Sequence, residues 1–218
     1  MERERKNSFT LLLVVLTVFL LLIPLVASGH RPGLGFIAIF ATVLVTSVFA
    51  ISRDRKLAIT AGVVAVLAVT LRVAHLASGT LWLDAAGWGA AILFLGLVAS
   101  IVLAHVLAPG RVDFDRIAGA ICAYLLLGLL WSFAYDLIDL LDPAAFRGLA
   151  AEGREAALTY FSFVTLTSLG YGDIVPASPL ARTLAWMEAV AGQMYLAVTV
   201  ATLVGLRIAH GRQETDDG

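Results

Sequence analysis

The sequence predicts an all-α integral membrane protein with six transmembrane helices and one shorter helix that enters the membrane and returns. Of its 218 residues, 60% are hydrophobic and 14% are charged, and the mean hydropathy is +0.93. Six apolar runs are long enough to cross a bilayer, whereas a seventh is too short. The lipid bilayer is therefore an expected partner. A net charge of -1 gives no reason to expect a nucleic-acid partner.

Charged or turn-forming residues end each of the long runs. The first run follows a mixed basic and acidic start and has an apolar core of about twenty residues, longer than that of an export signal, so we expect a retained transmembrane helix. Pro109-Gly110 ends the fourth run, and Asp142-Pro143 ends the fifth. The single cysteine, Cys122, excludes an intrachain disulfide. The expected helices cover residues 9–28, 34–52, 57–78, 85–108, 117–141 and 180–209.

The basic residues predict the orientation of these helices. With the N-terminus in the cytoplasm, ten Lys and Arg residues lie on the cytoplasmic side and four lie outside, while Arg72 lies within a helix. We therefore expect both termini to be cytoplasmic. Arg72 has two open interpretations: an ion pair with Asp84 or Asp136, or a side chain that extends along the helix to the outer surface.

The seventh apolar run covers residues 156–166 and is too short to span a membrane. Eleven residues of helix extend about 16 Å, roughly half of a bilayer core. Glu155, just before the run, suits the positive end of the helix dipole, and the opposite end would direct partial negative charge toward the membrane centre. Non-helical backbone can follow at that depth only where it is buried in protein or lines water.

The segment that follows, Thr165-Leu-Thr-Ser-Leu-Gly-Tyr-Gly-Asp173, is polar and glycine-rich. It resembles the selectivity filter of potassium channels, Thr-Val-Gly-Tyr-Gly-Asp, with four identical and two conservative positions. An ordinary turn is the alternative interpretation, since Gly and Asp form turns in many proteins. The flanking apolar helices favour the filter. We call residues 168–172 the filter segment: Ser168, Leu169, Gly170, Tyr171 and Gly172.

The resemblance implies that K⁺, as the permeant ion, is coordinated by oxygens of Ser168, Leu169, Gly170 and Tyr171; no other cofactor is expected. Carbonyl groups face one axis only if the backbone alternates in handedness. Glycine at 170 and 172 permits a positive φ without a Cβ clash. Serine at 168 keeps the hydroxyl of the family's threonine but lacks its β-branch, which predicts a less rigid inner site.

The resemblance also implies residues that support the filter, and several of these have a second interpretation. Tyr160 either packs behind the filter, within reach of Asp173, or lies in an interfacial aromatic belt. Glu188 either supports the filter or reaches water at the outer rim. Gly192 either bends the last helix or allows close packing, and Gln193 faces the cavity or a neighbouring helix. The predicted support residues are Thr167, Asp173, Tyr160 and Glu188, and those near the cavity or gate are Gly192 and Gln193.

Taken with the family's geometry, one filter segment per chain implies a homotetramer in the cell membrane that conducts K⁺ passively. The fourth run lacks the repeated arginines of voltage sensors, so little voltage dependence is expected. The alternatives are a nonselective cation channel and, less favoured, a membrane transporter; an enzyme is not expected, because Ser168 has no histidine in a comparable setting. The expected divisions are an N-terminus (1–8), a four-helix membrane domain (9–110), a pore domain (111–210) and a tail (211–218).

Overall fold

The computed structural model describes residues 8–27, 40–48, 55–110, 112–150 and 153–216. Almost all of the regular structure there is helical, together with two strands of two residues each. Residues 40–48 are also helical and belong to the second predicted run, the rest of which lies outside the described residues. The helices are α1 (Ser8–Ala27), α3 (Arg55–Ser78), α4 (Leu81–Leu107), α5 (Phe114–Leu141), α6 (Arg154–Leu166) and α7 (Pro179–Asp216).

Five of these helices, α1, α3, α4, α5 and α7, are long and apolar enough to cross a membrane. The prediction of a helical, multi-pass membrane protein is therefore confirmed. The count of six crossings stays a prediction, because residues 34–39 and 49–52 of the second run are outside the described part of the chain.

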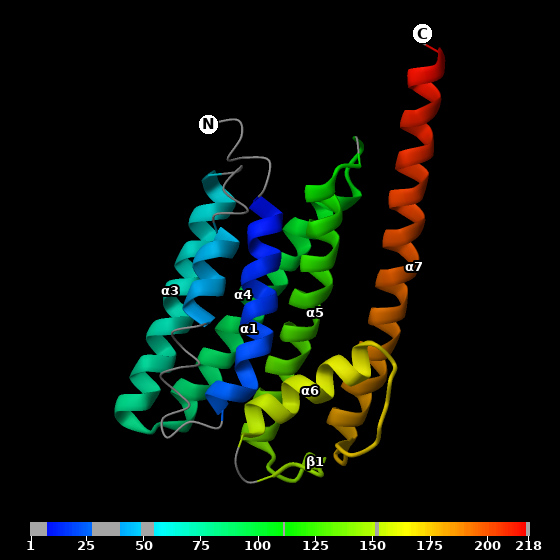
Figure 1. Ribbon diagram of the computed structural model, residues 1–218. Helices are drawn as coiled ribbons and strands as arrows, with labels where there is room; N and C mark the ends of the chain where they lie inside the picture. Colours follow the sequence, from blue (N-terminus) through cyan, green and yellow to red (C-terminus); the bar gives the residue numbers. More distant parts are fainter. Residues whose placement is uncertain (1–7, 28–39, 49–54, 111, 151–152, 217–218) are drawn as a thin grey trace.

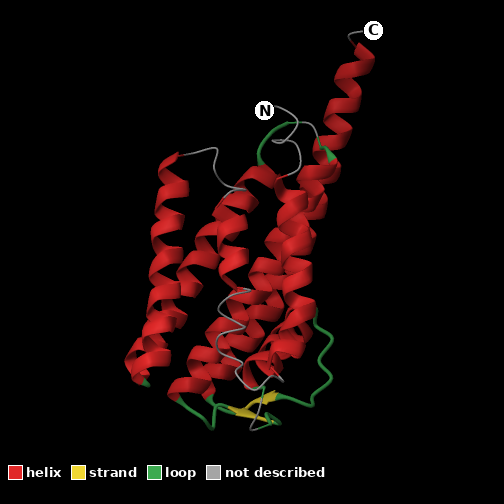
Figure 2. Ribbon diagram, turned by 60° about the vertical axis from the view of Figure 1, so that its left-hand side comes forward, coloured by secondary structure: helices red, strands yellow, loops and turns green. Residues whose placement is uncertain are grey.

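The long helices stand side by side, and α6 lies obliquely near one end of them (Figures 1 and 2). Helix α4 packs against both α3 and α5, and α1 packs against α5. Side chains from three helices fill the interior of this bundle: Leu12 and Phe19 of α1, Phe94 of α4, and Leu126 and Phe133 of α5. Inside a bilayer, such packing stabilises helix association mainly through van der Waals contact.

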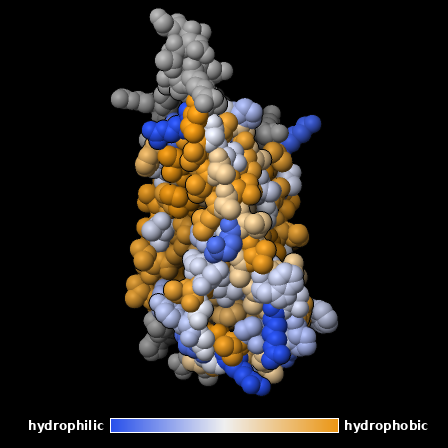
Figure 3. Space-filling model, turned by 90° about the vertical axis from the view of Figure 1, so that its right-hand side faces the viewer, coloured by the Kyte–Doolittle hydropathy of each residue, from blue (hydrophilic) through white to orange (hydrophobic). Residues whose placement is uncertain are grey.

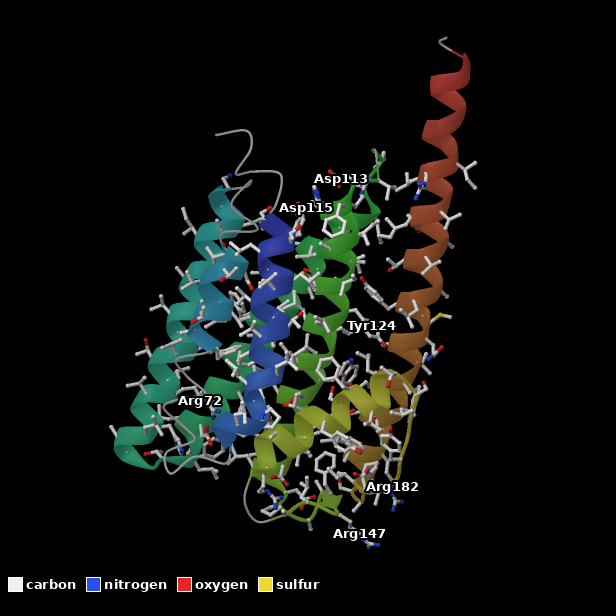
Figure 4. The ribbon with its side chains drawn as sticks, in the orientation of Figure 1. Arg72, Asp113, Asp115, Tyr124, Arg147 and Arg182 are labelled. Atoms are coloured by element: carbon white, nitrogen blue, oxygen red, sulfur yellow. The ribbon has the colours of Figure 1, made fainter. Side chains whose placement is uncertain are left out.

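Asp115 and Arg116, at the start of α5, form hydrogen bonds with the nearby ends of α1 and α4. Oδ1 of Asp115 accepts hydrogen bonds from the backbone N–H groups of Phe9 (3.1 Å) and Thr10 (3.0 Å), which have no partner within α1. The Arg116 guanidinium donates to the carbonyl of Gly110 (2.9 Å), just after the end of α4. Figure 4 labels Asp115 at this end and Arg147 and Arg182 at the opposite end. The start of α5 therefore fixes the nearby ends of two other helices.

The two strands lie at the opposite end of the bundle from the start of α5 and form a small antiparallel pair. Strand β1 (Phe146–Arg147) pairs with β2 (Val175–Pro176), so the segment before α6 lies against the segment after the filter (Figure 2). Gly148 allows this approach: its φ is +88°, and a Cβ there would lie 2.0 Å from the carbonyl oxygen of Asp173. These strands were not predicted, because two residues show no strand periodicity.

Two helix ends differ from their predicted positions by four residues or more. Helix α4 begins at Leu81, four residues before the predicted start, because Thr80 is the extended N-cap residue and Asp84 already lies in the first turn. Helix α7 continues to Asp216, seven residues beyond the predicted end. Polar residues continue α7 past the apolar run from which its length was predicted, whereas the residues added to α4 belong to the linker before its predicted run.

Candidate functional site

The candidate site is the turn that joins α6 to α7. Helix α6 has 13 residues, about 20 Å at 1.5 Å per residue, and cannot span a bilayer core. It packs between α5 and α7 at the end of the molecule that carries β1 (Figure 1). Residues 167–173 then leave the helix as non-helical backbone.

The backbone of the filter segment alternates in handedness. Ser168, Gly170 and Gly172 have φ values of +58°, +59° and +80°, whereas Leu169 and Tyr171 do not have positive φ. In ordinary extended backbone, successive carbonyls point to opposite sides, whereas alternation between left-handed and right-handed residues turns them toward one side. Gly170 and Gly172 have the sign of φ that the sequence predicts. Ser168, the one non-glycine residue with positive φ in the described chain, was not expected.

Hydrogen bonds to the last turn of α6 fix the start of the filter segment. The N–H of Leu169 donates to the carbonyl of Val164 (2.8 Å), and that of Ser168 donates to the carbonyl of Thr165 (2.9 Å). The Thr167 hydroxyl donates to the carbonyl of Phe163 (2.7 Å). These bonds satisfy carbonyls that the end of a helix leaves without partners.

The residues of this turn are exposed in the single chain. Within one chain, all residues from 167 to 173 are exposed, whereas Leu166 before them and Ile174 after them are buried. Bare non-helical backbone does not face lipid, because its N–H and C=O groups would lose their hydrogen bonds. The turn therefore requires a cover of protein or water.

Two neighbouring residues of α7 contact the start of the filter segment. The Gln193 amide donates to the Ser168 hydroxyl (3.2 Å), which places Gln193 at the inner end of the segment. A Cβ on Gly192 would lie 2.2 Å from the carbonyl oxygen of Leu166. Helix α7 is continuous through this position. Of the two interpretations of Gly192, the structure therefore favours close packing against α6 over a bend.

Glu188 lies fully buried between three helices. Its Oε2 accepts a hydrogen bond from the Tyr135 hydroxyl of α5 (2.5 Å), and its Oε1 is 2.6 Å from the Ser162 hydroxyl of α6. Ser162 also donates to the carbonyl of Gly128 (2.7 Å). Within the chain, the carboxyl group therefore contacts the short helix instead of reaching water, and its two partners lie outside the filter segment.

Tyr160 and Asp173 lie close together beside the filter segment. Desolvation raises the pKa of the Tyr160 phenol, and a hydrogen bond to the Asp173 carboxylate raises it further. Asp173 also contacts the β1 side of the pair of strands, through the close approach of its carbonyl to Gly148. The end of the filter segment is therefore in contact with α6 and with the loop that precedes it.

Arg72 connects α3 to the first turn of α6. Its guanidinium forms ion pairs with Asp84 and with Glu155 (3.2 Å), and lies 3.7 Å from the ring centroid of Trp88. Burial raises the pKa of Glu155, and Arg72 opposes that shift. The predicted pairing of Arg72 with Asp84 is thus present, whereas its pairing with Glu155 was missed.

Comparison with known proteins identifies this part of the chain. Residues 150–206 match the family model described as "Ion channel", and they include α6, the filter segment and most of α7. This segment of the chain is therefore similar to the ion channel family. The expected resemblance to potassium channels is confirmed by two relatives that match part of the chain.

Two relatives illustrate the extent of the match. An 84-residue stretch is 32% identical to the inward rectifier potassium channel Kirbac3.1 of Paramagnetospirillum magnetotacticum, covering 37% of this chain and 25% of the relative. An 83-residue stretch is 37% identical to the two pore potassium channel b of Oryza sativa subsp. japonica, covering 38% of this chain and 22% of the relative. The chain thus matches about a quarter of the length of each. No solved structure matches it significantly.

Proposed function

We propose that the protein is a potassium-selective channel that conducts K⁺ passively through a pore lined by the filter segment. The alternation of φ from Ser168 to Gly172 carries the proposal, because it turns successive carbonyl oxygens toward one side, as a dehydrated cation requires. The names of the two relatives add support, since both are potassium channels.

A homotetramer follows from the filter chemistry together with the exposed surface of the single chain. Four filter segments are needed to surround an ion with carbonyl rings in the geometry of this family. Only 11% of the α7 span is buried, compared with 56% of the α5 span. In the view of the α7 side, hydrophobic residues cover much of the upper part of the surface, whereas hydrophilic and intermediate residues gather over its lower part (Figure 3). Neighbouring copies would cover this surface and residues 167–173, satisfying the backbone that lipid cannot.

The proposed location is the cell membrane, with both termini in the cytoplasm. Helix α1 begins and α7 ends at the same end of the molecule, opposite α6 and β1 (Figure 1). Most basic residues lie on the side of the termini, which is therefore the cytoplasmic side. The filter segment, at the opposite end, then enters the membrane from outside.

Reconstitution into liposomes tests the proposed function. Purified protein in vesicles with an outward K⁺ gradient is expected to carry a K⁺ flux that empty vesicles lack. The reversal potential in mixed K⁺ and Na⁺ is expected to follow the K⁺ gradient. Equal permeability to the two ions would instead identify the nonselective cation channel. Uptake that needs a coupled ion gradient would identify a transporter.

A further inference from the structure

The hydroxyl of Ser162 has two acceptors and one proton. Its oxygen lies 2.7 Å from the carbonyl oxygen of Gly128 and 2.6 Å from Oε1 of Glu188. Both distances are those of good O–H···O hydrogen bonds. A carbonyl oxygen accepts only, so the Ser162 proton is needed for Gly128. The second short contact, between Ser162 and Glu188, then requires a proton from the carboxyl group.

The other oxygen of Glu188 already has its donor. Oε2 is 2.5 Å from the Tyr135 hydroxyl, which donates to it. One continuous chain of bonds results if Glu188 is protonated: Tyr135 donates to Glu188, Glu188 to Ser162, and Ser162 to Gly128. Each side-chain proton in this chain then has an acceptor, an arrangement that a buried polar cluster requires.

An ionised Glu188 fits the same atoms less well. The carboxyl group is fully buried within a membrane-spanning helix, and among the described residues no basic side chain forms an ion pair with it. An ionised carboxylate without a cation or water is costly at such a site. Its Oε1 would also have to share the single proton of Ser162 with Gly128.

We propose that Glu188 is a neutral glutamic acid at pH 7 and acts as a positioning residue that joins the short helix α6 to α5 and α7. Ser162 lies one turn before Leu166, the last residue of α6, so the bond that it receives fixes the helix from which the filter segment starts. The effect on ion conduction rests on the proposed channel function, whereas the protonation state does not.

Infrared difference spectroscopy of the purified protein tests the protonation state without reference to ion flux. At pH 7, the wild-type spectrum minus that of Glu188→Gln is expected to contain the carbonyl stretch of a protonated carboxylic acid. Asp142→Asn is the matched control: Asp142 is exposed at the end of α5, so its difference spectrum is expected to contain carboxylate bands instead. Carboxylate bands in the Glu188→Gln difference would overturn the proposal.

Flux through two variants tests the positioning role. In Glu188→Gln the amide oxygen accepts from Tyr135 and the amide N–H donates to Ser162, so K⁺ flux and the reversal potential are expected to stay at wild-type values. Glu188→Leu leaves the hydroxyls of Tyr135 and Ser162 without a polar partner at position 188. We expect flux per channel to fall by about tenfold, which corresponds to the loss of one buried hydrogen bond. Wild-type flux in Glu188→Leu would overturn the positioning role. Absence of flux in the wild-type protein would overturn the proposed function, while the infrared result would still decide the state of Glu188.

Discussion

Three residues of the filter segment have a left-handed backbone, and they differ in what that conformation costs. Gly170 and Gly172 adopt positive φ without a steric penalty, whereas Ser168 carries a Cβ. A left-handed conformation costs a residue with a side chain about 1–2 kcal/mol. The bonds that fix Ser168, from its N–H to Thr165 and from Gln193 to its hydroxyl, offset that cost.

Replacing Gly170 with alanine is expected to abolish K⁺ flux. The added Cβ disfavours φ = +59° by about 1–2 kcal/mol, so the backbone moves toward negative φ and the carbonyl turns away from its neighbours. The measurement is K⁺ flux per reconstituted protein, with membrane insertion checked separately.

Gly79→Ala is the matched control for that substitution. Gly79 lies in the turn between α3 and α4 with φ = +64°, and a Cβ added at either glycine would meet nothing within 4 Å. The two variants therefore introduce the same local strain at different places. Wild-type flux in Gly170→Ala, or equal loss of flux in both variants, would contradict the role of the filter segment.

At the scale of elements, hydrogen bonds and an ion pair join α6 to three of the long helices. Ser162 joins it to α5 and Glu188 of α7, and Glu155 joins it to Arg72 of α3. Its first residue, Arg154, forms a hydrogen bond with Asp139 of α5 (2.7 Å). Because α6 is too short to span the bilayer, these bonds determine its depth, and thereby the depth of the filter segment.

Replacing Gly192 with alanine is expected to lower the stability of the folded protein by about 1–3 kcal/mol, the usual cost of overpacking. The new Cβ would lie 2.2 Å from the carbonyl oxygen of Leu166, so α7 must move away from the end of α6. Thermal unfolding of the purified protein measures this effect.

Gly205→Ala provides the control on the same helix. A Cβ at Gly205 meets nothing within 4 Å, so this variant keeps wild-type stability or gains slightly from the higher helix propensity of alanine. Equal melting temperatures for Gly192→Ala and the wild type would show that close packing at Gly192 is not required.

The sequence was sufficient to predict the described long helices, the half-length helix and the filter segment, because apolar run length and glycine spacing carry that information locally. The pair of strands could not be predicted, since it depends on a contact between residues about thirty positions apart. The partners of Glu188 could not be predicted either. Tyr135 and Ser162 lie on other helices, and nothing in the local sequence indicates that they contact Glu188. Ser168 could not be recognised as left-handed, because its residue type does not favour positive φ.

At the scale of the whole molecule, the described helices before residue 111 carry few basic residues. Helix α4 contains no Lys or Arg. Arg72 of α3 is held by Asp84, Glu155 and Trp88, and moving it would separate two ion pairs in a largely buried site.

Voltage is therefore expected to change the open probability only weakly. One charge moved through 100 mV changes the energy by about 2.3 kcal/mol, and steep gating requires about three or four such charges in each subunit. Recording single channels in planar bilayers between about -100 and +100 mV measures the effective gating charge.

Arg72→Gln serves as the matched variant: if Arg72 is only a structural cation, its removal changes stability and leaves the voltage dependence unaltered. An effective charge of about ten per tetramer would contradict the prediction, since α4 has no cation to supply it and Arg72 provides only one per subunit.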